Sequence, residues 1–363
     1  MVQAVTSIDP CRAKGPPAFA ALDLGTNNCR LLVAAPQGQG FRVLDSYSRI
    51  VRLGEGLHES GRLSPPAMER AMGALQACAA RLARRPVRNL RAIATEACRQ
   101  AVNGADFLAD VRRATGLAID IISTREEAEL ALESCAPLLA QSAEAARRAL
   151  LFDIGGGSTE VAWVRLEPDG RCSLIGYHSL PAGVVTLAEK YGPAAQTREG
   201  FDAMVDDVAA RLRGFEAVHC IAREIRAGGV RLLGTSGTVT TLAGIALDLP
   251  RYRRPLVDGM VLCRAAADAA LARLRALGPA GLAEHPCVGP ERAAFVLPGC
   301  AVFAAITRLW PAGDVVVADR GLREGMLLRM MRADRGRMPA RARRRPEAAE
   351  PGAAGPVPAG LPA

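Results

Sequence analysis

Histidine and paired cysteine are scarce in this chain, and their scarcity excludes several classes of site. The 363 residues include four histidines, His58, His178, His219 and His285, which lie far apart. None of the ten cysteines stands in a C-x-x-C pair. A zinc site needs such ligands at close spacing, and a disulfide scaffold needs regularly spaced cysteines. The sequence disfavours both, and it is typical of a reducing, cytoplasmic location where cysteines act as small buried residues.

Long apolar runs are also missing. The longest, residues 293–306, is too short to cross a bilayer and contains Pro298 and Gly299. The first residues lack the charged head and apolar core of a secretion signal. We therefore expect neither a membrane span nor secretion.

Lysine is nearly absent: of 46 basic residues only Lys14 and Lys190 are lysines, and the net charge is +9. Arginine binds phosphate oxygens in pairs, so the charge permits a polyanionic partner. Alanine, glycine and proline are abundant too, and a GC-rich coding bias would explain all four residue types together. With 50% hydrophobic and 23% charged residues, a chain of this length predicts about two globular domains.

The chain does contain an internal repeat of one eight-residue pattern. Asp23-Leu24-Gly25-Thr26-Asn27-Asn28-Cys29-Arg30 aligns without gaps with Asp153-Ile154-Gly155-Gly156-Gly157-Ser158-Thr159-Glu160, and each copy lies between two short apolar runs. Such a pattern predicts a β-hairpin. Glycine lets the backbone approach an anion, hydroxyl and amide groups add donors, and aspartate can hold hydrated Mg²⁺. Two facing copies would hold one phosphate chain from both sides.

A third turn of this kind, Gly234-Thr235-Ser236-Gly237-Thr238, precedes an apolar helix predicted over 239–247. Free N–H groups and the helix dipole favour an anion at a helix N-terminus. One glycine-rich turn is weak support for a phosphate site, because tight turns need glycine anyway. Three of them in order are difficult to explain as turns alone.

Strands and helices are predicted to alternate in each half, which indicates two α/β domains with a cleft between them. We predict hairpins over 19–34 and 149–164 and further strands over 41–48, 50–53, 90–94, 119–122, 230–233 and 315–318. Helices are predicted over 64–82, 107–114, 125–140 and 203–220, with a last helix ending near Met331. The expected division is an arm over 1–17, domains over 18–140 and 141–332, and a disordered basic tail over 333–363.

The three turns occur together with four further motifs: Thr95-Glu96-Ala97-Cys98-Arg99, Glu126-Glu127-Ala128, Glu291-Arg292-Ala293 and Asp319-Arg320-Gly321-Leu322-Arg323-Glu324-Gly325. In this combination the chain resembles the exopolyphosphatase and guanosine pentaphosphate phosphatase family. This family lies within the actin-like ATPase superfamily. The resemblance covers about residues 18–331, and within the family the chain resembles the short, two-domain form. It implies two actin-like (ribonuclease H-like) domains with an interdomain cleft, the final helix packing back on the first domain. The chain departs from the family pattern at Thr124-Arg125, before the Glu-Glu-Ala motif, and at Ala294.

The resemblance also implies site roles. A glutamate of the Glu-Glu-Ala motif activates water against the terminal phosphorus; here we favour Glu127, with Glu126 as the alternative. The resemblance assigns Mg²⁺ to Asp153 and Glu160, with Asp23 as a third carboxylate. Arg320 and Arg323 are expected to anchor the final helix across the interdomain cleft. The residues expected to bind phosphate are Gly25, Thr26, Asn27, Asn28, Arg30, Arg99, Gly155, Gly156, Gly157, Ser158, Thr159, Gly234, Thr235, Ser236, Gly237, Thr238 and Arg292.

The expected function is Mg²⁺-dependent release of orthophosphate from inorganic polyphosphate. The alternatives are hydrolysis of guanosine pentaphosphate, an ATP-using sugar kinase or chaperone-type ATPase, and a non-catalytic phosphate sensor. The expected partner is therefore polyphosphate or guanosine pentaphosphate. The sequence is also compatible with a homodimer. The tail carries Arg341 and Arg343–Arg345, but a solvated tail is favoured over nucleic-acid binding.

Overall fold

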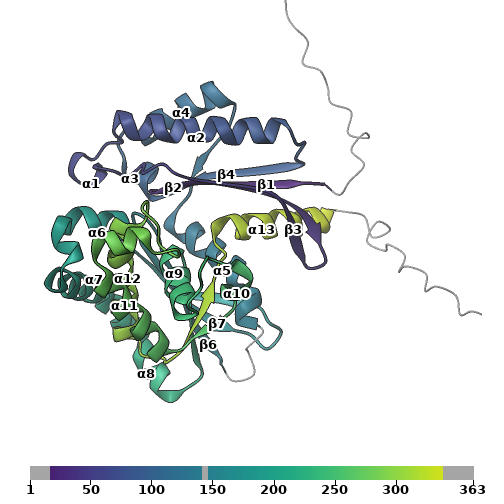
Figure 1. Cartoon of the computed structure of the whole chain (residues 1–363). Coiled ribbons are helices and arrows are strands. Elements are labelled where there is room, and N and C mark those ends of the chain that lie inside the picture. The colour runs from purple at the N-terminus through teal and green to yellow at the C-terminus, as the bar shows by residue number, and fades with distance from the viewer. Residues whose placement is uncertain (1–16, 141–145, 338–363) are drawn as a thin grey trace, which may run out of the picture.

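Two mixed β-sheets with the same strand arrangement organise the molecule (Figure 1). The computed structural model describes residues 17–140 and 146–337. The first sheet has the order β3-β2-β1-β4-β5, and the second has the order β10-β11-β9-β6-β7-β8. In each sheet, three antiparallel strands form a meander, and parallel strands continue from its first strand. These are β4 and β5 next to β1 in the first sheet, and β9 and β11 next to β6 in the second. The strands are β1 Phe19–Leu24, β2 Asn28–Gln37, β3 Gly40–Ile50, β4 Asn89–Ala94, β5 Asp120–Ile121, β6 Arg148–Ile154, β7 Thr159–Leu166, β8 Cys172–Leu180, β9 Val230–Thr235, β10 Val261–Leu262 and β11 Val315–Ala318.

Helices cover both faces of each sheet, which gives two α/β domains. Those before β6 are α1 Leu57–Ser60, α2 Pro65–Ala83, α3 Glu96–Gln100, α4 Gly104–Thr115 and α5 Thr124–Ala140. Those after it are α6 Val184–Tyr191, the 3₁₀ helix Gly192–Gln196, α7 Arg198–His219, α8 Ile221–Ala227, α9 Gly237–Ala246, α10 Arg254–Val257, α11 Arg264–Glu284, α12 Ala293–Leu309 and α13 Leu322–Arg337. Ser64 caps α2 as predicted, its hydroxyl accepting from the Ala67 N–H. No helix within the described ranges is long and apolar enough to span a membrane.

The first strand of each domain is buried on both faces, which explains its uninterrupted apolar run. In β1, Leu22 and Leu24 face the core under α2 and α4, whereas Phe19 and Ala21 face α13. The two sets alternate because successive strand side chains point to opposite faces. Strand β6 alternates in the same way between the core of the second domain and helix α5.

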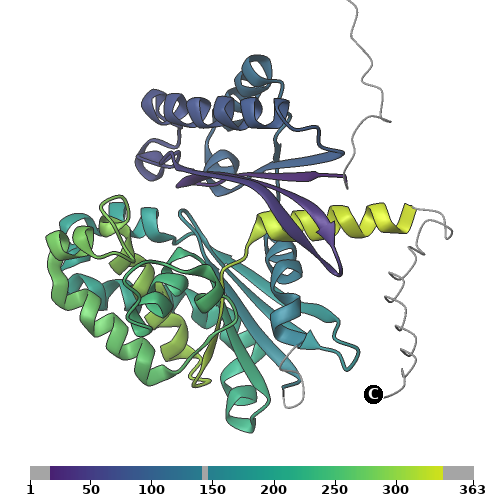
Figure 2. The ribbon, with the colours of Figure 1, turned by 45° about the vertical axis from the view of Figure 1, so that its right-hand side comes forward.

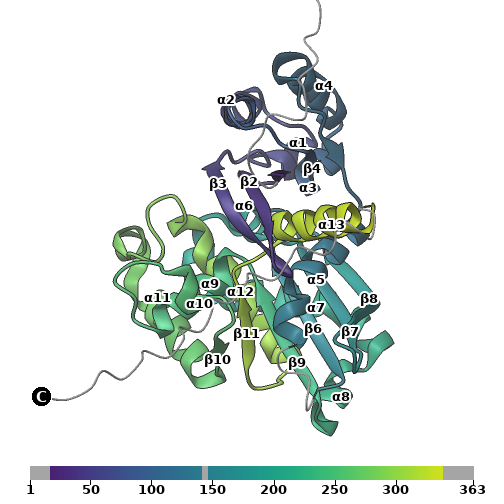
Figure 3. The ribbon, with the colours of Figure 1, turned by 90° about the vertical axis from the view of Figure 1, so that its right-hand side faces the viewer.

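The last helix of each half packs on the other half's sheet. Helix α5 packs against β6, β7 and β9, and α13 packs against β1 and β2. Figures 2 and 3 show α13, in yellow, running between the first sheet and the second domain. The two helices also meet each other: a Cβ on Gly325 of α13 would lie 2.2 Å from the Leu130 carbonyl oxygen of α5. Glycine at this position therefore sets how closely α5 and α13 approach.

Two predictions about elements need correction, and several elements were not predicted, among them β8, α6, α11 and α12. Residues 51–53 are not a strand, because β3 ends at Ile50 and the N–H groups of Val51 and Arg52 instead donate to the Asn27 carbonyl. Helix α12 was not predicted, because it is apolar on nearly all sides and shows no 3.6-residue period. Helix α13 continues past Met331 to Arg337, into the segment assigned to the tail. The rest of that tail and residues 1–16 of the predicted arm lie outside the described residues.

Candidate active site

The two repeated sequences form the same turn. In the first, the Gly25 N–H donates to the Asn28 carbonyl at 2.9 Å; in the second, the Gly155 N–H donates to the Ser158 carbonyl at 2.9 Å. The strand register places Asp23 opposite Arg30 and Asp153 opposite Glu160. The gapless alignment of the sequence copies therefore holds in the backbone, with arginine and glutamate at the equivalent position.

The two turns touch each other across the domain boundary. A Cβ on Gly156 would lie 3.1 Å from the Asn27 backbone nitrogen, and one on Gly157 would lie 2.7 Å from Thr26 Oγ1. Behind them, a Cβ on Gly183 would lie 2.4 Å from the Gly156 carbonyl oxygen. A side chain at position 157 or 183 would therefore force neighbouring atoms to move, and one at position 156 would have little room.

The third turn contains a strained residue at the start of α9. Ser236 has φ of 126°, a region that non-glycine residues rarely occupy and that costs on the order of 1–3 kcal/mol. Its hydroxyl accepts hydrogen bonds from the N–H groups of Thr238 and Val239, which holds the turn in place. Such strain clusters at functional sites, and this turn forms part of the same cavity as the other two.

A cavity of about 600 Å³ lies where the three turns converge. Most of the residues predicted from the sequence line it, and they come from both domains. They are Asp23, Gly25, Thr26, Asn27, Asn28, Arg30, Glu127, Asp153, Gly155, Gly156, Gly157, Ser158, Glu160, Thr235, Ser236, Gly237, Thr238 and Arg292.

Four predicted residues do not line this cavity. Glu126 turns away and binds Arg91 at 3.2 Å, on the neighbouring strand β4. Arg99 pairs with Glu96 and Glu127 and lines a separate cavity. Thr159 is buried and donates to the Ala182 carbonyl. Gly234 lies in β9, where a Cβ would be 2.5 Å from the Phe152 ring, so packing explains this glycine.

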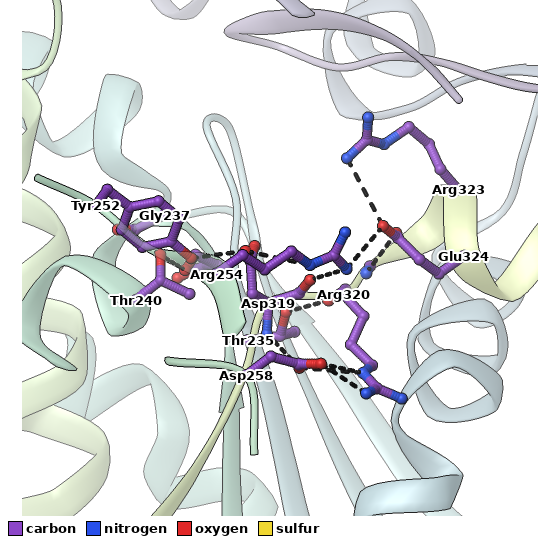
Figure 4. Close-up of polar contacts among 12 residues, drawn as sticks. Thr235, Gly237, Thr240, Tyr252, Arg254, Asp258, Asp319, Arg320, Arg323 and Glu324 are labelled. Atoms are coloured by element: carbon purple, nitrogen blue, oxygen red, sulfur yellow. Dashed lines mark hydrogen bonds and ion pairs between the residues drawn. The ribbon is translucent and has the colours of Figure 1, made fainter. Parts of the chain in front are cut away.

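Sequence reasoning missed several cavity residues near the start of α13. Tyr252, Asp319 and Arg323 line the cavity, and Figure 4 shows how they are connected. The Tyr252 hydroxyl donates to Asp319 Oδ2 at 2.6 Å. Arg320 is bound instead by Asp258 at 2.6 Å, within the second half, so it fixes this turn without crossing the cleft. The Asp-Arg-Gly-Leu-Arg-Glu-Gly motif was the available signal, but it did not show that both of its arginines line the cavity.

Four carboxyl groups in the cavity have raised pKa values because they are removed from water. Burial raises the pKa of Asp153 to about 6 and that of Glu160 to about 7. Burial also raises the pKa of Asp23, with Arg30 and Arg323 opposing it. The pKa of Glu127 is raised well above its usual value, first by burial and then by Glu160, while Arg99 opposes the shift.

Positive charge faces these carboxylates. Burial lowers the pKa of Arg292, and the nearby Arg30 lowers it further. Burial also lowers the pKa of Arg323, against the opposing effect of Glu324. Carboxylates and partly desolvated arginines in one cavity suit an anion that arrives together with a cation.

The oxygen atoms around Asp23 are suited to a hard cation. Asp23 Oδ1 and Asn27 Oδ1 are buried, and neither accepts a hydrogen bond within the described residues. Buried acceptors without a donor are rare and point to an unseen ligand. The described ranges contain no group of three or more His, Cys, Asp or Glu side chains placed to hold a metal. A bound Mg²⁺ would therefore take most of its ligands from phosphate and water, as Mg²⁺ commonly does.

Comparison with known proteins decides the family. The profile of the Ppx/GppA phosphatase family matches residues 32–334. The chain belongs to the Ppx/GppA phosphatase family. Among solved structures, a Ppx/GppA family member from Aquifex aeolicus is 25% identical, with 88% of this chain and 98% of that chain covered and a TM-score of 0.71. The two α/β domains are thus those of this family.

Two further solved structures are similar to this Ppx/GppA phosphatase over most of its length. An exopolyphosphatase-like protein is 27% identical, with 86% of this chain and 97% of that chain covered and a TM-score of 0.77. An exopolyphosphatase from Cytophaga hutchinsonii is 21% identical, with 87% and 98% covered and a TM-score of 0.77, which shows the shared fold. The Ppx/GppA phosphatase described here thus spans nearly the full length of these relatives.

Proposed function

We propose that this Ppx/GppA phosphatase hydrolyses the terminal phosphoanhydride bond of inorganic polyphosphate and releases orthophosphate. The observation that carries the proposal is the placement of the buried carboxylate of Glu127 in a cavity lined by three phosphate-type turns, by arginines and by further carboxylates. The likeness to an exopolyphosphatase-like protein at 27% identity supports it.

The turns and arginines provide binding and orientation. Gly25 and Gly155 begin equivalent turns on the two domains, so a phosphate chain between them would be contacted from both sides. Arg30 from the first domain and Arg292 from the second add planar guanidinium groups that suit phosphate oxygens. Holding the terminal phosphate and a water in fixed geometry supplies much of the catalysis in phosphoryl transfer.

Glu127 is the proposed base. The residue is 7% exposed, and Arg99 donates to its Oε2 at 3.1 Å. The carboxylate would accept a proton from a water as the water oxygen attacks the terminal phosphorus. The raised pKa makes the ionised form a stronger base than an exposed glutamate.

Asp153 and Glu160, with Asp23, would hold a hydrated Mg²⁺ beside the phosphate, with most of its ligands being water and phosphate oxygens. The unpaired Asp23 Oδ1 supports this role, and so does the burial that raises the pKa of Asp153 and Glu160, because a bound cation would offset the cost of burying their charge. When bound, Mg²⁺ would neutralise charge on the phosphate oxygens.

Phosphate release by the purified protein tests the proposal. Long-chain polyphosphate and guanosine pentaphosphate would each be supplied with Mg²⁺ or with EDTA, and Glu127→Gln protein would exclude a contaminating phosphatase. We expect faster release from polyphosphate, lost in EDTA and in the variant. A clear preference for guanosine pentaphosphate would replace the proposed substrate, and turnover of ATP alone would favour an ATP-using function.

A further inference from the structure

Arg99 makes three contacts that all concern the base or its surroundings. Its Nη1 donates to Glu127 Oε2 at 3.1 Å and to the Ile122 carbonyl at 2.8 Å, and its Nη2 donates to Glu96 Oε2. Glu96 is held in turn by the Gln100 side chain. One guanidinium therefore binds two carboxylates and one backbone oxygen at once.

Arg99 reaches Glu127 from outside the substrate cavity. Glu127 and Glu96 line the 600 Å³ cavity with the phosphate-type turns, whereas Arg99 does not. Arg99 instead lines a second cavity of about 530 Å³, with Gln100, Thr124, Tyr177 and others, and Glu96 is the residue shared by both. Arg99 is therefore not placed to contact a phosphate in the first cavity.

The contact with Ile122 also fixes the backbone that carries Glu127. Ile122 precedes α5, which begins at Thr124, and Glu127 lies in the first turn of that helix. Arg99 Nη1 thus holds both the approach to α5 and the carboxylate. Only arginine presents several donors in one rigid plane, so lysine cannot reproduce all three contacts.

We propose that Arg99 is a positioning residue, which orients the Glu127 carboxylate from behind and does not bind the polyphosphate. This inference rests on the proposed function, and it replaces the phosphate-binding role expected from the sequence. It follows that Arg99 supports the chemical step and contributes little to substrate affinity.

The chain offers a matched control at the glutamate next to the base. Arg91 binds Glu126 at 3.2 Å, so the two adjacent glutamates each have an arginine partner. Glu126 and Arg91 lie outside the substrate cavity, whereas Glu127 lines it. Substitution of Arg91 therefore tests the loss of a similar ion pair without disturbing the base.

Steady-state kinetics on polyphosphate would separate positioning from binding. In Arg99→Met we expect kcat to fall on the order of 100-fold, with KM and the directly measured polyphosphate Kd within about threefold of wild type. Arg99→Lys should recover part of kcat, and Arg91→Met should change neither constant. A raised KM and Kd with kcat preserved would overturn the inference, because that is the signature of a phosphate-binding residue.

Two further measurements keep the inference testable if Arg99→Met folds poorly. Guanidinium ion at millimolar concentration should restore part of kcat in Arg99→Ala, because the second cavity gives it access, and should not help Glu127→Gln. In a Glu127→Asp background, where the carboxylate recedes, Arg99→Lys should lower kcat less than it does in wild type. Equal losses in both backgrounds, or absence of rescue in folded Arg99→Ala, would overturn the inference. Wild-type protein without phosphate release from polyphosphate would instead refute the proposed function.

Discussion

Removing the charge of Glu160 should stabilise the protein at alkaline pH. Glu160 is 6% exposed, and its Oε1 accepts hydrogen bonds from Ser158 Oγ at 2.7 Å and Ser179 Oγ at 2.9 Å. Glutamine keeps an oxygen acceptor for both hydroxyls and has nearly the same volume. Glu160→Gln therefore removes the buried charge while it preserves the hydrogen bonds and the packing.

The magnitude follows from the pKa of Glu160, which burial raises from 4.5 to about 7. A carboxyl group whose pKa is raised on folding contributes full stability below the unfolded pKa, and this contribution is lost as pH rises through the folded pKa. At roughly 1.4 kcal/mol for each pH unit, the ionised group at pH 8 costs up to about 3 kcal/mol. Because Glu160 is coupled to other carboxylates, we expect Glu160→Gln to be more stable by about 1–3 kcal/mol.

Urea unfolding in EDTA at pH 8 and pH 5 measures this difference. The gain in the free energy of unfolding should be largest at pH 8 and should shrink at pH 5, where native Glu160 is mostly protonated. Exposed Glu69 on α2 supplies the control, and Glu69→Gln should change stability by less than about 0.5 kcal/mol. A variant that is less stable than wild type at pH 8, or equally more stable at both pH values, would refute the reasoning. Mg²⁺ should stabilise wild type more than the variant, if Glu160 helps to hold it.

Three further predictions concern turnover and packing. Glu127→Gln should abolish phosphate release while the polyphosphate Kd, measured by titration, stays near that of wild type; wild-type turnover would contradict the base assignment. Because the pKa of Glu127 is raised and the base must be ionised, kcat/KM should rise with pH from 5 towards neutral, and a pH–rate profile already flat at pH 5 would contradict this. Gly325→Ala should lower the free energy of unfolding by about 2 kcal/mol or more, because its Cβ would clash with the Leu130 carbonyl of α5. The control Gly214→Ala, on an exposed position of α7 with open space around it, should raise stability by up to about 1 kcal/mol, and equal effects of both changes would refute the packing argument.

Elements with strong local signals were predicted well. Ser64 and two prolines marked the start of α2, and the apolar runs around each glycine turn marked the hairpins. Helix α12 was missed because burial on nearly all sides removes the periodic pattern from which a helix is recognised. The C-terminal end of α13 was placed too early because contacts of Asp334 with Arg88 and of Arg335 with the Gly38 carbonyl hold a charged, weakly periodic segment in helical form.

The sequence by itself determined the three turns, their order and the carboxylate of the Glu-Glu-Ala motif, because each depends on residues adjacent in the chain. It did not determine which of two neighbouring glutamates faces the cavity, or which arginines do. The choice between the glutamates depends on the packing of α5 against the second sheet, which brings Glu127 to the cavity and leaves Glu126 outside it, and the packing of α13 against the first sheet brings Arg323 to the cavity. Arg99 lies on α3 and is held outside the cavity by Glu96 and Glu127. A rotation of about 100° between successive helix residues separates such neighbours, and only the packing partners of the helix select the side that faces the substrate.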